Sequence, residues 1–202
     1  MAAPFLRILS QRRRAQSLVP EAPTRAEIEQ IVRAAAGRPS EDEPAPWRVI
    51  ATTREQAPQL AAALSGLRSL PEIGDGSAPL KGKQLRRLAA FRGSLAFAMR
   101  GGLALALVFE PVRGSELSRK RQRMEAHAMH TVLEAALCGA GWGVQWSPRE
   151  SPDAEVLNDF YGLDEKEEVL GWLFVGRVPL EEARAVSGSS ARPGPSVLEF
   201  RD

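Results

Sequence analysis

Two stretches of this chain carry residues whose types and spacing suit the binding of a flat, anionic molecule. Three arginines, Arg12, Arg13 and Arg14, stand together near the start, and guanidinium groups grip phosphate through paired, charge-assisted hydrogen bonds. A run rich in glycine and tryptophan, residues 139–146, follows an apolar segment much later in the chain. Together they suggest a phosphorylated, planar cofactor held between a basic clamp and a Gly/Trp-rich turn.

The arginine run also has a simpler interpretation as the solvated, basic end of a helix, where the helix dipole stabilises positive charges. If the run is helical, three consecutive residues fan over about 200° around the helix axis. We therefore expect two of the three guanidinium groups on a phosphate and one on solvent or an acidic neighbour.

A second cluster could bind a metal ion. His127, His130, Glu134 and Cys138 recur at spacings of three and four, which places them on one face of a helix, and their side chains are typical metal ligands. One helix seldom supplies a full coordination shell, however, and the whole chain holds 2 histidines. We therefore expect no metal, and buried or interface polar residues at these positions.

A third possibility is a nucleic acid or acidic partner bound by two basic clusters. Residues 12–14 form one cluster and residues 119–123 form the other, and such clusters are the electrostatic footprint of nucleic-acid binding. The formal net charge is only +2, which provides no strong attractive field. Because the sequence also lacks a recognisable binding module, we expect no nucleic-acid partner.

Size and composition fit one folded domain. The chain has 202 residues, of which 44% are hydrophobic and 26% charged, ordinary values for a globular protein with a real core. Its 1 cysteine excludes an internal disulfide. No apolar run approaches the length of a membrane span, and residues 1–9 do not resemble a secretory signal. We expect a cytoplasmic protein that binds no membrane.

Helices dominate the elements that must position these residues. Thr24 and Glu27 have capping-box spacing at the start of one helix. A later segment, 124–140, is apolar on nearly every side, which predicts a long buried central helix. The expected helices are 5–15, 24–35, 53–67, 84–91, 124–140 and 154–161, and the expected strands are 47–52, 103–109, 168–175 and 196–200. This pattern indicates an α+β or an α/β fold.

The order of several motifs gives the chain a family resemblance. An arginine run, a Pro-containing turn before a helix and a loop ending in Pro-Trp come first. A long helix, a Gly-Trp-Gly turn and an apolar strand that ends in glycine and proline come later. In this order the chain resembles the FMN-dependent nitroreductase family, in particular its compact single-domain branch, over about residues 6–180. The stretches that carry the resemblance are 11–14, 22–24, 31–35, 39–40, 46–48, 124–148, 156–157, 161–163 and 169–179.

This resemblance implies an α+β homodimer with FMN held by both subunits at their interface. The sheet would be mixed or antiparallel, flanked by helices, with a long buried central helix. One domain would span 1–202, and residues 181–202 would form a C-terminal extension that could be exchanged between subunits. The implied cofactor contacts are Arg12, Arg13 and Arg14 on the phosphate and Trp146, Ser147 and Pro148 along the flavin, largely through backbone groups.

The implied reaction passes a hydride from NADH or NADPH to the flavin, which then reduces a small electron-poor acceptor such as a nitroaromatic or a quinone. In such enzymes the cofactor performs the chemistry and the protein positions it. We therefore assign no side chain as a catalytic acid, base or nucleophile.

Several positions depart from the family pattern. Gly37 stands where arginine is common, Glu41 replaces a basic or polar residue, Ala45 replaces a glutamine, Ser17 replaces an arginine and Arg14 replaces a serine. A carboxylate close to a phosphate repels it. Either the arginines compensate, or the acidic loop swings away, or flavin binding is weak or absent. The alternative function is therefore that of a degenerate nitroreductase-fold dimer that lacks flavin and acts as a binding protein.

Overall fold

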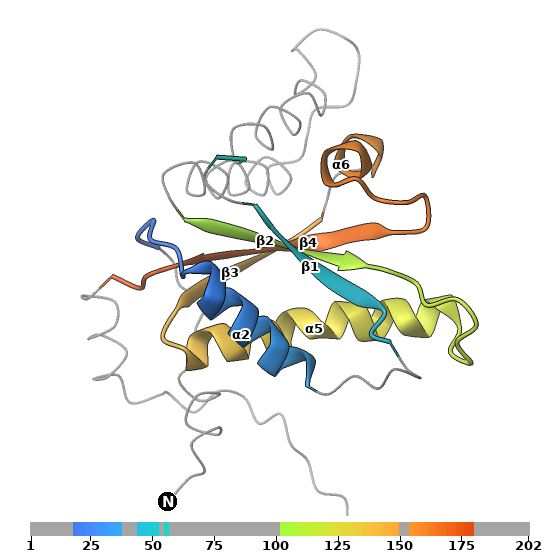
Figure 1. The fold of residues 1–202 in the computed structure, drawn as a ribbon, viewed down its shortest axis with the longest axis horizontal. Coiled ribbons are helices and arrows are strands. Elements are labelled where there is room, and N and C mark those ends of the chain that lie inside the picture. The colour runs from blue at the N-terminus through green and yellow to red at the C-terminus, as the bar shows by residue number, and fades with distance from the viewer. Residues whose placement is uncertain (1–17, 38–43, 53–54, 57–101, 150–153, 180–202) are drawn as a thin grey trace, which may run out of the picture.

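A four-stranded antiparallel sheet is the centre of the fold, in a computed structural model that describes residues 18–37, 44–52, 55–56, 102–149 and 154–179. The elements in chain order are α2 (Arg25–Ala36), β1 (Trp47–Thr52), β2 (Leu103–Phe109), α5 (Arg119–Gly139), β3 (Gly143–Pro148), α6 (Ala154–Tyr161) and β4 (Glu168–Gly176). The strand order is β1-β2-β4-β3, and each neighbouring pair is antiparallel. Helices α2 and α5 lie on one face of the sheet and α6 lies on the other (Figure 1). This architecture confirms the α+β fold class.

Helix α2 forms where the sequence predicts it, and for the predicted reason. The Thr24 hydroxyl accepts a hydrogen bond from the Glu27 N–H at 3.3 Å, and the Glu27 carboxylate accepts one from the Thr24 N–H at 2.7 Å. Gly37 ends the helix with a φ of 70°, a backbone conformation that glycine adopts without steric cost. Ile28 and Ile31 are the buried side chains of the helix.

The central strands β2 and β4 divide the core into two layers. Every residue of β2 is buried, and successive side chains point to opposite faces. Leu105 and Leu107 pack in the layer that contains α2 and α5. Ala104 and Ala106 pack in the layer that contains Leu157 of α6. These two layers bury both faces of the sheet centre and fix the register of the edge strands.

Helix α5 begins earlier than expected. Its first residue is Arg119 instead of Met124, and the Ser118 hydroxyl caps it by accepting from the Arg121 N–H at 3.3 Å. The basic segment that the sequence interpretation left outside the helix therefore forms its first turn.

The side of α5 that faces the sheet is buried, and the outer side is not. Leu133 and Leu137 are fully buried, whereas Met124 is 65% exposed and Val132 44% exposed. The expectation of a helix buried on nearly every side therefore holds for one side only in the single chain. The outer side presents apolar residues to the surface.

Residues 143–148 form a strand, although the resemblance assigned their end to a turn. β3 pairs with β4 in continuous register, from Gly143 opposite Gly176 to Pro148 opposite Gly171. The turn after α5 is shorter than expected and contains Gly141, whose φ is 86°. The Gly/Trp-rich run is therefore a tight turn followed by a strand at the edge of the described sheet.

Several expected elements lie outside the described residues. They are the helices 5–15 and 84–91, nearly all of 53–67, the strand 196–200 and the C-terminal extension 181–202. The single-domain organisation over 1–202 stays a prediction.

Candidate functional site

Trp47 and Trp146, which belong to the two halves of the family resemblance, lie on opposite edges of the described sheet. Trp47 is the first residue of β1, and Trp146 lies on β3. Three inter-strand steps of about 4.8 Å separate their strands, and the register places Trp146 level with Ala51, four residues along β1 from Trp47. The two residues are therefore roughly 20 Å apart. The structure therefore does not bring the Pro46-Trp47 stretch and the Gly/Trp-rich run together within one chain.

Trp146 lies between α5 and the sheet, beside both histidines of the chain. Its indole stacks on the His130 imidazole, with ring centroids 4.6 Å apart and planes 19° from parallel. His127 approaches the indole edge-on, with centroids 6.1 Å apart and an angle of 79°. These contacts define an aromatic cluster of Trp146, His127 and His130 at the junction of α5 and β3.

Hydrogen bonds fix the His130 ring. Its Nδ1 lies 2.6 Å from the carbonyl oxygen of His127, and because that oxygen only accepts, Nδ1 carries a proton. Its Nε2 lies 3.2 Å from the Thr131 hydroxyl. Partial desolvation lowers the pKa of His127, the positive charges of His130 and Arg123 lower it further, and Glu168 opposes them.

The other neighbour of Trp146 is the bulge in β4. Leu107 pairs with Gly171 and Val108 with Val169, so one residue of β4, Leu170, is extra. A Cβ on Gly171 would lie 2.6 Å from Cη2 of Trp146 and 2.6 Å from the carbonyl oxygen of Ser147. Glycine at this position therefore lets the indole lie against the backbone of β4.

The three residues expected to line a flavin lie together at the end of β3, but on two faces. Side chains alternate along a strand, so Trp146 and Pro148 face α5 and Ser147 faces the α6 side. The Arg149 N–H donates to the Leu170 carbonyl at 3.0 Å and prolongs the pairing with β4. The three side chains therefore cannot all contact one flavin from the same face, whereas the backbone groups of the three residues lie along one strand.

The opposite end of β3 meets the segment that follows the arginine run. A Cβ on Gly143 would lie 2.5 Å from Leu18 Cδ2 and 2.8 Å from Val178 Cγ2. Val19 and Arg177 exchange backbone hydrogen bonds of 2.8 and 3.1 Å. Leu18 is the first described residue, and the predicted phosphate contacts Arg12, Arg13 and Arg14 lie outside the described part of the chain.

Arg177 adds a cation at this corner that the sequence interpretation did not assign. Its guanidinium carbon lies 3.9 Å from the centroid of the Trp142 ring, and its Nε lies 2.9 Å from a carboxylate oxygen of Glu21. The side chain is 45% exposed. The sequence contained a sign of this cation, an arginine directly after the glycine that ends an apolar strand, but the sequence interpretation did not use it.

Comparison with known proteins decides the family. A sequence profile of the nitroreductase family matches residues 9–177. The chain belongs to the nitroreductase family. This finding confirms the resemblance, and the match spans every described helix and strand from α2 to β4.

Relatives of this nitroreductase-family chain cover nearly its full length. YdjA of Escherichia coli strain K12, which carries the name of an NAD(P)H nitroreductase, is 24% identical over 195 residues, 96% of this chain and 98% of YdjA. The FMN-dependent nitroreductase NfnB of Mycobacterium smegmatis, solved in complex with NADPH, matches with a TM-score of 0.60, 17% identity and 98% coverage of both chains. Iodotyrosine deiodinase, solved with FMN and 3-iodo-L-tyrosine, matches with a TM-score of 0.63, 16% identity and 98% coverage of both chains. The two structures share the fold of this chain.

The metal interpretation gains no support from this nitroreductase-family structure. Among the described residues, no three His, Cys, Asp or Glu side chains are grouped so that they could hold a metal ion. His130 uses both ring nitrogens in hydrogen bonds within α5. Glu134 is 7% exposed, as expected for a buried polar residue, whereas His127 is exposed and His130 and Cys138 are half-buried.

The basic cluster of α5 is engaged within the fold. Arg123 forms two hydrogen bonds of 2.8 Å with the Glu168 carboxylate. Arg119 donates to the Lys166 carbonyl at 2.6 Å, and Arg121 pairs with Glu125 at 3.6 Å. These contacts reduce the charge that the cluster presents to a polyanion.

In the part of the chain that the structure describes, no helix is both long and apolar enough to cross a bilayer.

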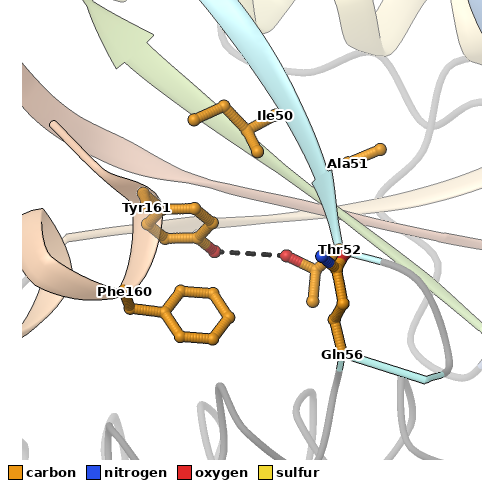
Figure 2. Close-up of a pocket in the computed structure, with 6 residues that line it drawn as sticks. All are labelled: Ile50, Ala51, Thr52, Gln56, Phe160 and Tyr161. Carbon is orange, nitrogen blue, oxygen red and sulfur yellow. Dashed lines mark hydrogen bonds between the residues drawn. The ribbon is translucent and has the colours of Figure 1, made fainter.

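A separate hollow of about 250 Å³ lies on the α6 face of the sheet, at the end of β1 (Figure 2). The Tyr161 hydroxyl accepts from the Trp172 indole N–H at 2.9 Å and lies 3.3 Å from the Thr52 hydroxyl. Burial raises the pKa of the Tyr161 phenol, so the phenol stays neutral and serves this network. Thr52 and Pro148 lie at opposite ends of the sheet, and we assign the hollow no part in the cofactor site.

Proposed function

We propose that this chain is a flavin-dependent oxidoreductase that binds FMN and reduces a small electron-poor acceptor with NADH or NADPH. The observation that carries the proposal is the family match over residues 9–177. The chemistry that bound FMN supplies is transfer of reducing equivalents from the nicotinamide to the acceptor. The residues of this chain supply binding and orientation, and the acceptor class is of the nitroaromatic or quinone type.

The chemistry of the residues along β3 fits such a cofactor. β3 is the last strand in the described sheet order, so one of its edges carries backbone donors and acceptors that no described strand uses. A flavin ring offers polar atoms that such groups can bind. Arg177 stands at the Gly143 end, beside the segment that follows the arginine run, and supports a phosphate at that end.

We also propose that the active unit is a homodimer in which each cofactor contacts both chains. The roughly 20 Å between Trp47 and Trp146 favours contacts from different subunits over contacts from one. A groove of about 670 Å³ between α2 and α5 supports a partner surface, because its lining is mostly apolar, with Ile31, Ala34, Val132, Ala135 and Ala136 among its residues. Exchange of the extension 181–202 between subunits belongs to the same proposal.

One specific observation supports the alternative function, that of a flavin-free binding protein with the same fold. Gly37 has a φ of 70°, a backbone conformation that an arginine rarely adopts, so the arginine common at this position in the compact branch would be strained here. An arginine contact to the cofactor from this position would therefore be missing in this chain.

Paired substitution of Arg12→Ala and Arg13→Ala tests the site assignment. Hydrogen bonds to charged groups contribute about 1.5–3 kcal/mol each, so we expect FMN affinity to fall by at least about tenfold. Arg113→Ala, which removes one positive charge in the turn after β2, is the control and is expected to leave affinity unchanged. FMN retained at wild-type occupancy in the paired variant would overturn the assignment.

A further inference from the structure

We infer that His130 is a positioning residue: it holds the Trp146 indole against β4 and thereby orients the Ser147–Pro148 end of β3. The inference deepens the proposed function, because it concerns the segment that we assign to the flavin. Its geometric basis, however, is independent of any cofactor.

The stacking geometry is the first observation. The His130 and Trp146 rings are 4.6 Å apart and 19° from parallel, within the range of favourable aromatic pairs. Trp146 is a side chain with 2 rotatable bonds, so one flat contact restricts its orientation strongly. Because Trp146 directly precedes Ser147, the orientation of the indole and the path of the strand end are coupled.

The fixed orientation of the imidazole is the second observation. Nδ1 donates to the His127 carbonyl at 2.6 Å and Nε2 lies 3.2 Å from the Thr131 hydroxyl. Both partners belong to α5, so the ring is anchored to a rigid helix of 21 residues. A phenylalanine at this position would keep the stacking ring without these two hydrogen bonds, so it separates the contribution of stacking from that of the anchoring.

The third observation is the contact of the Trp146 indole with β4 at Gly171. A Cβ on Gly171 would lie 2.6 and 2.7 Å from Cη2 and Cζ2 of Trp146, distances that real Cβ atoms do not show. The six-membered ring of the indole therefore rests where a side chain would otherwise stand. His130 from α5 and Gly171 from β4 together clamp the indole between helix and sheet.

Fluorescence of the cofactor-free protein tests the clamp directly. The contribution of Trp146 is obtained by subtracting the emission of the matching Trp146→Phe protein, so that the 3 other tryptophans cancel. Acrylamide quenching of this contribution is compared in wild type, His130→Ala and His130→Phe. His130 is partly exposed, so both variants are expected to fold, and far-UV circular dichroism verifies this.

The clamp predicts that His130→Ala raises the quenching constant of Trp146 above the wild-type value, because the indole loses the ring that covers one of its faces. His130→Phe retains a stacking ring and is expected to restore most of the protection. Quenching that is unchanged in His130→Ala, or that is not restored by His130→Phe, would overturn the inference.

FMN titration of the same three proteins separates this inference from the proposed function. If wild type binds FMN, the clamp predicts weaker binding in His130→Ala and recovery in His130→Phe. If wild type binds no FMN, the proposed function fails, while the quenching result on the cofactor-free proteins still decides whether His130 positions Trp146.

Discussion

At the residue scale, we predict that His127 makes the stability of the fold depend on pH. The pKa of His127 is lowered, mainly by partial desolvation and then by the positive charges of His130 and Arg123. A histidine whose pKa is lowered by folding stabilises the folded state at pH values above 6.5, its pKa in the unfolded chain. That stabilisation is lost as the pH falls through the pKa of the folded state.

Melting temperatures between pH 8 and pH 5 check this prediction. Wild type is expected to lose more stability on acidification than His127→Gln, whose side chain does not titrate, because the unfolded wild-type chain takes up the proton more readily. Equal pH profiles for the two proteins would show that His127 makes no net contribution in this range.

Gly171→Ala is the second prediction at this scale. The new methyl group would meet the Ser147 carbonyl oxygen and the Trp146 ring at 2.6 Å, and such overpacking costs about 1–3 kcal/mol. Urea unfolding measures the loss. The same substitution in a Trp146→Leu background is expected to cost less, because one of the two clashing partners is shortened; an equal cost in both backgrounds would rule out the indole contact as a cause.

The assignment of Trp146, Ser147 and Pro148 to a flavin site stays a prediction. The structure adds the directions of their side chains, which alternate between the two faces of the sheet at the end of β3. The sequence did not predict that Trp146 stacks on His130, because that contact joins α5 to β3 and depends on a bulge in β4. The same histidines suggested a metal site, since helical spacing shows which residues share a face but not what packs against that face.

At the element scale, α2 depends on its capping box. The Thr24 hydroxyl is 3.3 Å from the Glu27 nitrogen, and the reciprocal bond is 2.7 Å. Thr24→Ala is expected to lower the free energy of unfolding by about 1 kcal/mol, measured by chemical denaturation. Thr24→Ser retains the hydroxyl and serves as the control. A loss in the serine protein as large as in the alanine protein would exclude the cap as the cause.

Elements with strong local signals were predicted almost to the residue. The capped helix α2 and the apolar strands β2 and β4 are such cases, because their patterns reflect burial that is already visible in the sequence. Residues 143–148 were taken for a turn, because glycine and proline at their ends suggest a turn while Val144 and Trp146 alternate as in a strand. Residues 143–148 form a strand because they pair with β4, a segment that is distant in sequence.

At the scale of the whole molecule, the outer side of α5 is the surface that a partner subunit would cover. Val132 is 44% exposed and lines the groove of about 670 Å³ between α2 and α5. Val132→Glu would place an unpaired charge in a buried interface and is expected to weaken self-association roughly tenfold or more. Light scattering after gel filtration measures the mass, and Arg113→Glu in the turn after β2 is the control.

A dimer that persists in Val132→Glu would show that the subunits associate through another surface. A partner subunit, as proposed, would also explain why α5 looked fully buried in the sequence but is exposed along one side in a single chain. A sequence pattern reports burial in the assembled protein and does not tell which chain provides it.

The most direct test of the central claim is an absorption spectrum of the purified protein between about 350 and 500 nm, before and after incubation with FMN and gel filtration. The account predicts two flavin bands that stay with the protein and bleach when NADH or NADPH is added. A colourless protein that does not retain FMN would contradict it, and the flavin-free binding protein would then be the better account of this nitroreductase-family chain.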